Sequence, residues 1–510
     1  MKTIKRSIAL VLAMILTLAM SVTVFAAPNA DQNTFSLTLN KAVKGHTYEA
    51  YQILSGDLSA DKATLSNIKW GEGIKAEGQT ALGGDAVAYA KKLSDMGNNS
   101  SELKEQAQII GANLASASGS VTVTDPDAKN VISNLKPGYY LIKDKDDSLQ
   151  GQESYTEFIL HVTDDVNADV KADVPSVEKK VKDTNDTTGE TTGWQDSADY
   201  DIGDDVPFQL TATLANNIES YKTYSLKFND TLSKGLDYNN DAVIKLGNKD
   251  ITSYFTPSYD ATAKTLTFTC DNILAFGAKN SDKIVVEYTA KLNENAVIGA
   301  AGNPNTVGLE FSNNPNNGGE GDRGKTPEDK VIVFTYKLTV NKVDKDNKPL
   351  TGAEFSLFKK VKVDGKEELQ LVEVKKILST NAEGTVFGFT GLDDGTYVLR
   401  ETKTPDGYNS IEDQTFTISA KHDENSDDPK LTALTGDVAS GSIINLGVML
   451  EKGELSTDVV NNKGSVLPST GGAGTRQYLL VCFIGIPFIT AYNIISASPI
   501  FCLISAILLR

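Results

Sequence analysis

The chain has 510 residues and a formal net charge of −18 at pH 7, from 67 acidic and 49 basic side chains. This length suffices for about three domains of ordinary size. The acidic excess argues against nucleic acid as a partner, because the phosphate backbone attracts basic surfaces.

The amino-terminal segment has the pattern of a secretory signal. Basic residues precede an apolar run over Ile8–Val24, and small residues follow it. We predict that residues 1–26 are a signal peptide, cleaved between Ala26 and Ala27.

Cysteines and histidines provide few chemical sites. Cys482 and Cys502 lie in an apolar carboxyl-terminal segment, which leaves Cys270 alone in the rest of the chain, so we expect no disulfide there. The histidines are not spaced with cysteines or acidic residues as metal ligands are; they are His46, His161 and His422. We interpret them as surface or strand residues, and we expect neither a metal nor a cofactor.

Two acidic stretches have the composition of calcium loops, Asp183–Asp186 and Asp344–Asn347. We interpret both as plain turns, because short acidic stretches are more often turns than ion sites.

Residues 27–172 combine strand and helix patterns. Apolar and polar residues alternate over Phe35–Val43, which places Lys41 on the apolar face. Helix formers dominate Ala86–Met96 and Ser101–Ala115. Strand patterns then return at Ser120–Thr124, Gly138–Asp144 and Glu157–Thr163. We expect an α+β domain with a dominant sheet.

The pattern of residues 173–335 predicts a second domain, in which three polar residues fall on apolar strand faces. They are Lys179 in the pattern of residues 177–181, Asp230 in 224–230 and Asn305 in 305–311. Lys180 is the neighbouring alternative to Lys179. Glu287 competes with Asp230, but the alternation turns it outward and turns Tyr288 inward, so we prefer Asp230.

Residues 336–463 read as a third domain with the same arrangement. Lys342, Glu401 and Asn461 each share a strand face with apolar neighbours, and Asn462 is the alternative to Asn461. In the first domain, Lys41 and Asp144 occupy comparable positions. No asparagine there falls clearly on an inward last strand.

The third domain resembles the collagen-adhesin B-type domain of Gram-positive pilins and adhesins. Val340–Asp344, Gly352–Phe355 and Tyr397–Tyr408 carry the resemblance, the last as the pilin E-box. The resemblance implies tandem immunoglobulin-like β-sandwiches, mainly β, behind the α+β first domain.

The family's chemistry explains why lysine, acid and asparagine occur together. Burial lowers the pKa of a lysine and raises that of a carboxyl group, so both can be neutral. The amine then attacks the asparagine side chain while the acid shuttles protons. By resemblance, Asp230 and Glu401 are the proton shuttles, and isopeptide bonds join Lys179 to Asn305 and Lys342 to Asn461. We expect no such bond in the first domain.

Residues 464–510 contain Leu467–Gly472, which resembles a cell-wall sorting signal. In that family a sortase thiolate attacks the threonine carbonyl, here Thr470, and releases the chain from Gly471 onward. The apolar segment Tyr478–Leu509 is long enough to hold the precursor in a membrane. Only Arg510 follows it, fewer basic residues than the family usually has.

Backbone pilins of this family carry an acceptor lysine, often as Tyr-Pro-Lys, between their first and second domains. Here Val166–Asp173 contains Lys171 without the Tyr or Pro. We expect Lys171 to be the acceptor of the next subunit's Thr470.

The resemblance therefore implies a structural subunit, most simply the backbone, of a covalent pilus at the cell wall. Its implied partners are pilin-specific and housekeeping sortases, other pilin subunits and peptidoglycan, and a host ligand stays open. A minor pilin or monomeric wall-anchored adhesin is the alternative. A secreted enzyme has no support, because no nucleophile with a paired histidine is evident in the sequence.

Overall fold

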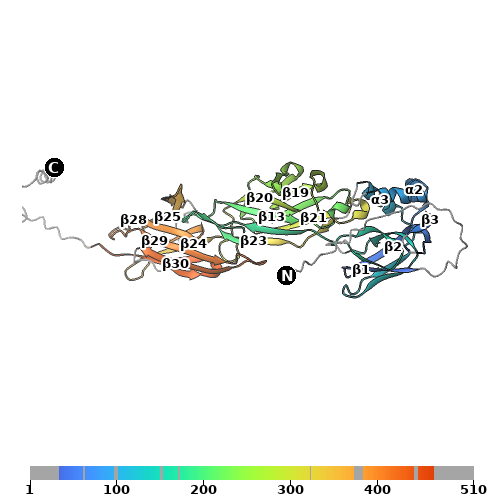
Figure 1. The fold of residues 1–510 in the computed structure, drawn as a ribbon. Coiled ribbons are helices and arrows are strands. Elements are labelled where there is room, and N and C mark those ends of the chain that lie inside the picture. The colour runs from blue at the N-terminus through green and yellow to red at the C-terminus, as the bar shows by residue number, and fades with distance from the viewer. Residues whose placement is uncertain are drawn as a thin grey trace, which may run out of the picture.

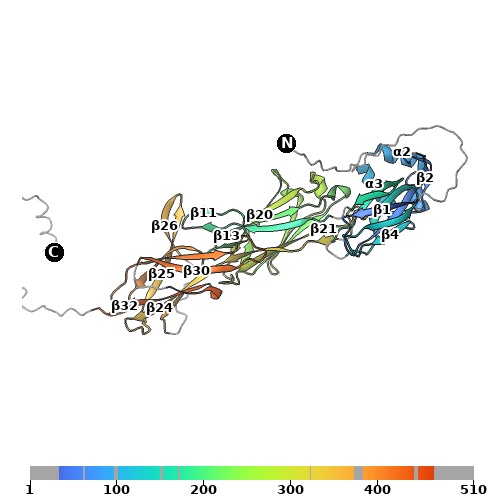
Figure 2. The same cartoon turned by 60° about the horizontal axis from the view of Figure 1, so that its bottom comes forward.

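The computed structural model describes residues 34–60, 62, 64–96, 101–149, 153–170, 173–321, 323–372, 383–440 and 446–464. They form three β-rich bodies that follow one another in an elongated molecule (Figure 1). In a second view the blue first body and the orange third body again lie at opposite ends (Figure 2). The expectation of a mainly β chain of tandem domains is confirmed, and the described α-helices all lie in the first body.

The first body packs helices and a small sheet on opposite faces of a larger sheet. Its elements are β1 (Phe35–Asn40), β2 (Thr47–Leu58), β3 (Leu65–Trp70), α1 (Ala76–Ala81), α2 (Ala86–Asp95), α3 (Ser101–Ala112), β4 (Gly119–Thr122), β5 (Asn130–Leu135), β6 (Gly138–Asp144), β7 (Glu157–Val162) and β8 (Val166–Asp169). The larger sheet has the order β3-β2-β6-β7, and the smaller has β5-β1-β8. In β6, Tyr139 and Leu141 join the core under the helices, whereas Tyr140 and Ile142 join the core under the small sheet. Strand β6 is therefore buried on both faces.

The second body is a sandwich of two sheets. Its strands are β9 (Ser176–Val181), β10 (Thr184–Asn185), β11 (Glu190–Thr191), β12 (Ser197–Asp199), β13 (Asp205–Thr213), β14 (Leu226–Leu232), β15 (Leu236–Tyr238), β16 (Val243–Leu246), β17 (Lys249–Asp250), β18 (Thr256–Asp260), β19 (Thr265–Cys270), β20 (Lys283–Leu292), β21 (Asn303–Ser312), β22 (Arg323–Lys325) and β23 (Asp329–Phe334); the 3-10 turns are η1 (Ile218–Ser220), η2 (Thr252–Tyr254), η3 (Ile273–Phe276) and η4 (Pro315–Asn317). One sheet has the order β17-β16-β20-β13-β9 and the other β12-β23-β21-β14-β19-β18. Alternation builds the core, because every second residue of β13, from Val206 to Ala212, is buried.

The third body is a second sandwich. It comprises β24 (Tyr336–Asp344), β25 (Glu354–Val363), β26 (Lys366–Leu371), β27 (Val386–Leu392), β28 (Gly395–Lys403), β29 (Gln414–His422), β30 (Leu431–Ser440), β31 (Gly447–Met449), η5 (Leu450–Lys452) and β32 (Glu454–Asn461). Its sheets have the orders β27-β24-β32-β31 and β26-β25-β28-β29-β30. The first and last strands, β24 and β32, are parallel neighbours.

Both junctions between bodies are held by specific contacts. At the first, the Tyr155 amide donates to the Asn313 carbonyl at 2.7 Å, and the hydroxyls of Ser154 and Tyr221 lie 2.8 Å apart. At the second, only the buried residue Thr335 separates β23 from β24. No helix among the described residues is long and apolar enough to cross a membrane.

Gly319, beside the first junction, allows a test of close backbone packing. Its φ is +93°, and a Cβ there would lie 1.8 Å from the Thr223 carbonyl oxygen, whereas Gly277 has a similar φ of +91° with open space around it. We expect Gly277→Ala to cost about 1–2 kcal/mol of unfolding free energy through the left-handed conformation alone. Gly319→Ala should cost clearly more, because backbone must also move. Denaturant titration followed by Trp194 fluorescence measures both, and equal losses would contradict the packing argument.

Candidate functional site: two buried lysine, acid and asparagine clusters

The second body brings Lys179, Asp230 and Asn305 together in its core. Lys179 projects from β9 in one sheet, whereas Asp230 and Asn305 project from the adjacent strands β14 and β21 of the other. All three side chains have no exposed surface. The cluster therefore spans the two sheets of the sandwich.

Lys179 is held directly by the acid. Its Nζ donates to Asp230 Oδ1 at 2.8 Å and to Oδ2 at 2.9 Å. The ring of Phe208 also lies 5.3 Å from Nζ. Burial lowers the pKa of Lys179, and the Asp230 carboxylate opposes that shift. Asp230 is thus the counter-charge of an amine that burial pushes toward its neutral form.

Tyr288 on β20 completes this cluster, although strand alternation predicted only that it turns inward. Its hydroxyl donates to Asp230 Oδ2 at 2.5 Å and accepts from Lys179 Nζ at 3.1 Å and from Asn305 Nδ2 at 2.8 Å. Asn305 Oδ1 is buried without a hydrogen bond. Tyr288 therefore orients the amide of Asn305 and connects it to the acid and the amine.

The neighbouring alternatives lie elsewhere. Lys180 Nζ donates to Asp196 Oδ1 at 2.5 Å, away from the core cluster. Glu287 accepts from the side chain of Gln209 at 2.8 Å. Strand alternation thus placed Lys179 and Asp230 on the correct face.

The third body brings Lys342, Glu401 and Asn461 to one place from β24, β28 and β32. Lys342 pairs with Val459 in the parallel register, so Asn461 lies on the same face two residues further along β32. Lys342 and Asn461 are fully buried, and Glu401 is half-buried. The alternative residue, Asn462, is exposed.

The contacts of this cluster differ from those of the second body. Asn461 Nδ2 donates to Glu401 Oε2 at 3.0 Å, while Asn461 Oδ1 and Glu401 Oε1 are buried without a hydrogen bond. Lys342 Nζ donates to the carbonyls of Val343 and Val459 at 3.0 and 2.8 Å. The amine is thus satisfied by backbone oxygens, and the amide is held by the acid.

The third-body amine is partly neutral at physiological pH. Burial lowers the pKa of Lys342 to about 8, although the Glu401 carboxylate opposes the shift. Roughly a tenth of the amine is then unprotonated at pH 7. An unprotonated amine is a nucleophile, whereas an ammonium ion is not.

The first body has no comparable cluster among its described residues. Lys41 was expected on the apolar face, and this is wrong: β1 ends at Asn40, Lys41 has a φ of +56°, and its side chain is 75% exposed beside Asp169. Asp144 is buried, but it accepts from the Thr156 amide at 2.5 Å and pairs with His46.

The interpretation of the histidines needs one correction. His161 and His422 lie in strands β7 and β29, as expected. His46 precedes β2 outside any strand and is only 1% exposed. The structure also contains a pairing of a hydroxyl with a histidine that the sequence analysis did not find. Ser197 Oγ lies 2.7 Å from His422 Nδ1. Ser197 is fully buried and donates to the Asp423 carbonyl at 2.6 Å, so it cannot reach a substrate.

Several predicted site residues lie outside the described residues. They are the signal cleavage positions Ala26 and Ala27, the acceptor Lys171, and the sortase positions Thr470 and Gly471 in Leu467–Gly472. The apolar segment Tyr478–Leu509 lies outside them too.

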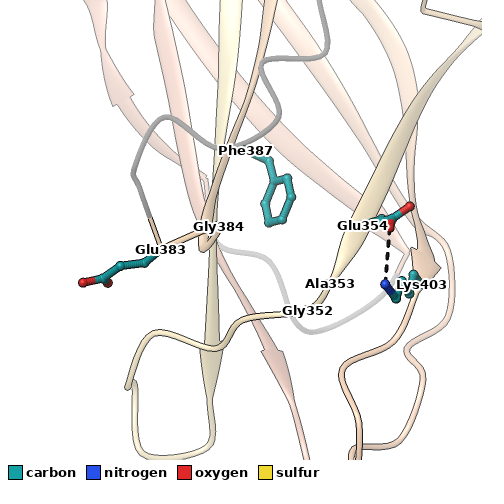
Figure 3. Close-up of a pocket in the computed structure, with 7 residues that line it drawn as sticks. All are labelled: Gly352, Ala353, Glu354, Glu383, Gly384, Phe387 and Lys403. Atoms are coloured by element: carbon teal, nitrogen blue, oxygen red, sulfur yellow. Dashed lines mark ion pairs between the residues drawn. The ribbon is translucent and has the colours of Figure 1, made fainter.

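A surface pocket in the third body has few residues that could act on or bind a ligand. Its lining includes Phe387 and the ion pair of Glu354 with Lys403, whose Oε1 and Nζ are 3.5 Å apart (Figure 3). No cluster of catalytic groups lines it.

The fold and the two clusters define a class: tandem β-sandwiches, each with a lysine, an acid and an asparagine in its core. Residues 336–430 match the SpaA prealbumin-like fold domain. Residues 202–315 match the Cna-B-like domain of Gram-positive pilin backbone subunit 2. These two parts of the chain thus match models of Gram-positive pilin domains, and the resemblance to such pilins is confirmed.

Individual proteins are also similar to this chain. The trypsin-resistant surface T6 protein of Streptococcus pyogenes serotype M6 is 27% identical over 237 residues, which are 43% of this chain and 42% of that protein. The chain thus matches less than half of that relative's length. The solved T6 backbone pilin of the same organism has a similar fold, with a TM-score of 0.53 and 20% identity over 86% of this chain and 100% of that one. The full-length major pilin SpaD of Corynebacterium diphtheriae gives a TM-score of 0.48 and 19% identity, over 86% of this chain and 100% of that one.

The pairing of Lys179 with Asp230 predicts an unequal response to single and double substitution. Asp230→Ala leaves a buried amine without its acid, which we expect to cost about 3–5 kcal/mol of unfolding free energy. Adding Lys179→Met to Asp230→Ala should recover part of that loss, because no unpaired charge remains. Denaturant unfolding measures both, with exposed Asp271→Ala as the control. A double variant no more stable than Asp230→Ala would contradict the pairing.

Proposed function

We propose that this chain is the backbone subunit of a covalently polymerised pilus on a Gram-positive cell surface. The observation that carries the proposal is the pair of lysine, acid and asparagine clusters in domains that match pilin families. The proposed domain limits are 27–172, 173–335 and 336–463, between the signal peptide and the sorting segment.

Each cluster is proposed to form one isopeptide bond. The neutral amine of Lys179 or Lys342 attacks Cγ of Asn305 or Asn461, a new C–N bond forms, and the amide nitrogen leaves as ammonia. Asp230 or Glu401 takes a proton from the amine and delivers it to the departing nitrogen. The hydrogen bond from Asn461 Nδ2 to Glu401 Oε2 already connects the acid to the leaving group. In the second body, Tyr288 is the positioning residue between them.

The proposed bonds increase the resistance of each domain to mechanical unfolding. Each closes a loop of more than 100 residues, for which chain-entropy arguments on disulfides give roughly 4–5 kcal/mol. In the third body the bond joins the first strand, β24, to the last, β32, so tension passes from one to the other without loading the strands between. A pilus exposed to shear gains from such a covalent path.

Assembly is proposed to use Thr470 near the carboxyl end and Lys171 between the first and second domains. A pilin-specific sortase joins Thr470 of one subunit to Lys171 of the next, and a housekeeping sortase transfers the finished polymer to peptidoglycan. The protein is then secreted and wall-anchored, after a transient membrane stage. A minor pilin or a monomeric adhesin would share the isopeptide bonds and lack only the Lys171 linkage.

The isopeptide proposal predicts a mass deficit. Intact mass spectrometry of a recombinant polypeptide 27–463 should show two ammonia losses relative to the sequence. Glu401→Ala should restore one ammonia and make the third domain sensitive to protease, whereas exposed Glu412→Ala should leave the mass deficit unchanged. An unmodified polypeptide at full sequence mass would refute the proposal.

Polymerisation is tested separately. Co-expression with the cognate pilin sortase should give a ladder of high-mass species, and tandem mass spectrometry should find Thr470 joined to Lys171. Lys171→Ala should abolish the ladder, while Lys182→Ala, a lysine in the following domain, should not. A ladder unchanged in Lys171→Ala would show that Lys171 is not the acceptor. No ladder in any variant would favour the monomeric adhesin.

A further inference from the structure

The junction of the second and third bodies concentrates buried acidic groups. Asp183, Asp199 and His422 place one ligand atom each within 4.8 Å of one another. Asp183 and Asp199 come from the second body, and His422 comes from β29 of the third. Asp183 was expected to belong to a plain turn, but the residues that follow it form the short hairpin strand β10. The cluster thus joins two bodies whose only direct chain connection is Thr335.

His422 is oriented so that its Nε2 faces the acids. Ser197 uses its own proton to donate to the Asp423 carbonyl, so its oxygen accepts from the N–H at His422 Nδ1. Nδ1 is therefore the protonated ring nitrogen. Nε2 is then available as a lone pair, and this arrangement of an imidazole held from behind by a hydrogen bond is typical of metal-bound histidines.

The distance between the histidine and Asp183 fits shared coordination better than a direct ion pair. Nε2 lies 3.4 Å from Asp183 Oδ2. Charge-assisted hydrogen bonds are shorter, at about 2.7–2.9 Å. Two ligands of a tetrahedral Zn²⁺, each bound at about 2.1 Å, lie roughly 3.4 Å apart.

Unpartnered polar atoms surround the same point. Asp199 is 2% exposed, and its Oδ2 and the buried Oδ1 of Asp183 make no hydrogen bond of ordinary geometry. The hydroxyl of fully buried Tyr336 faces Asp199. An imidazolium at His422 would offset only one of the two carboxylate charges and would still leave Asp183 Oδ1 without a hydrogen bond.

A neighbouring acidic cluster shows what a neutralised site at this junction looks like. Asp186, Asp201 and Asp393 each contact Lys359 Nζ, which donates to Asp186 at 2.9 Å and to Asp201 at 2.7 Å. That cluster contains its own cation. The cluster of Asp183, Asp199 and His422 has no lysine or arginine among its described contacts.

We propose that Asp183, Asp199 and His422 bind a divalent transition-metal ion, of which Zn²⁺ is the best-fitting example. Two carboxylates and one imidazole suit Zn²⁺ better than Ca²⁺ or Mg²⁺, which prefer oxygen ligands alone. The ion clamps the second body to the third and stiffens the junction. This site is independent of the isopeptide bonds and of pilus assembly.

The test uses tag-free polypeptide 27–470, stripped with EDTA and titrated with Zn²⁺. We expect one tightly bound Zn²⁺ per chain by native mass spectrometry and isothermal titration calorimetry, and a higher melting temperature with Zn²⁺. Asp199→Asn and His422→Ala should each weaken binding by more than the ~10–100-fold typical of outer-shell losses. Asp186→Asn is the matched control, since it removes a carboxylate from the same junction and should keep the affinity.

Two further measurements keep the proposal refutable if a variant fails to fold. Ser197→Ala removes the hydrogen bond that orients the histidine, together with the one to the Asp423 carbonyl. It should lower the affinity about tenfold in a folded protein. Zn²⁺ X-ray absorption of the unaltered protein should show one imidazole among oxygen ligands. No bound Zn²⁺, an equal loss in Asp186→Asn, or a spectrum without imidazole would overturn the assignment.

Discussion

Each of the two sandwiches depends on one constraint, which is that a lysine in an apolar core needs polar partners for its amine. An isolated ammonium ion inside a protein costs several kcal/mol. The second body meets this with Asp230 and Tyr288, and the third meets it with backbone carbonyls around Lys342. The same burial that makes the amine costly also lowers its pKa and makes it reactive. Reactivity and cost therefore have one origin, and a covalent bond to asparagine would remove both.

Strand alternation was enough to find these clusters because each residue lies in a regular, one-sided strand. Lys179 lies on the same strand face as buried Val181, and Asn461 lies on the same face as buried Leu455 and Val459, so the period of two assigned their faces correctly. The same rule failed at Lys41, where the strand ends and the backbone turns to positive φ. It also failed to predict β2, because Tyr51 to Leu54 are buried on both faces beside a bulge, which removes the alternation.

The side-chain contacts at the junction between the second and third bodies could not be predicted from the sequence. Asp183, Asp199 and His422 lie on separate strands or loops, and the histidine is more than 200 positions away from the acids. No local pattern brings them together; the direct connection through Thr335 and the packing of β12 beside β23 do. Tyr288 is an intermediate case, since alternation turned it inward but gave no reason for a polar role. Contacts made by tertiary packing cannot be predicted from local sequence patterns, whereas the buried face of a regular, one-sided strand can.

The position of Asn305 has a consequence for how the molecule would stretch. Strand β23 follows β21 and leads into the third body, so the proposed bond at Asn305 leaves about 30 residues, from 306 to 335, outside the closed loop. In the third body the bond at Asn461 lies almost at the end of the last strand. Under tension, β23 can lose its pairing with β12 and β21 while both closed loops stay intact. The released segment extends at most by roughly 100 Å. The subunit would then behave as a stiff rod with one short, reversible spring of fixed maximum length.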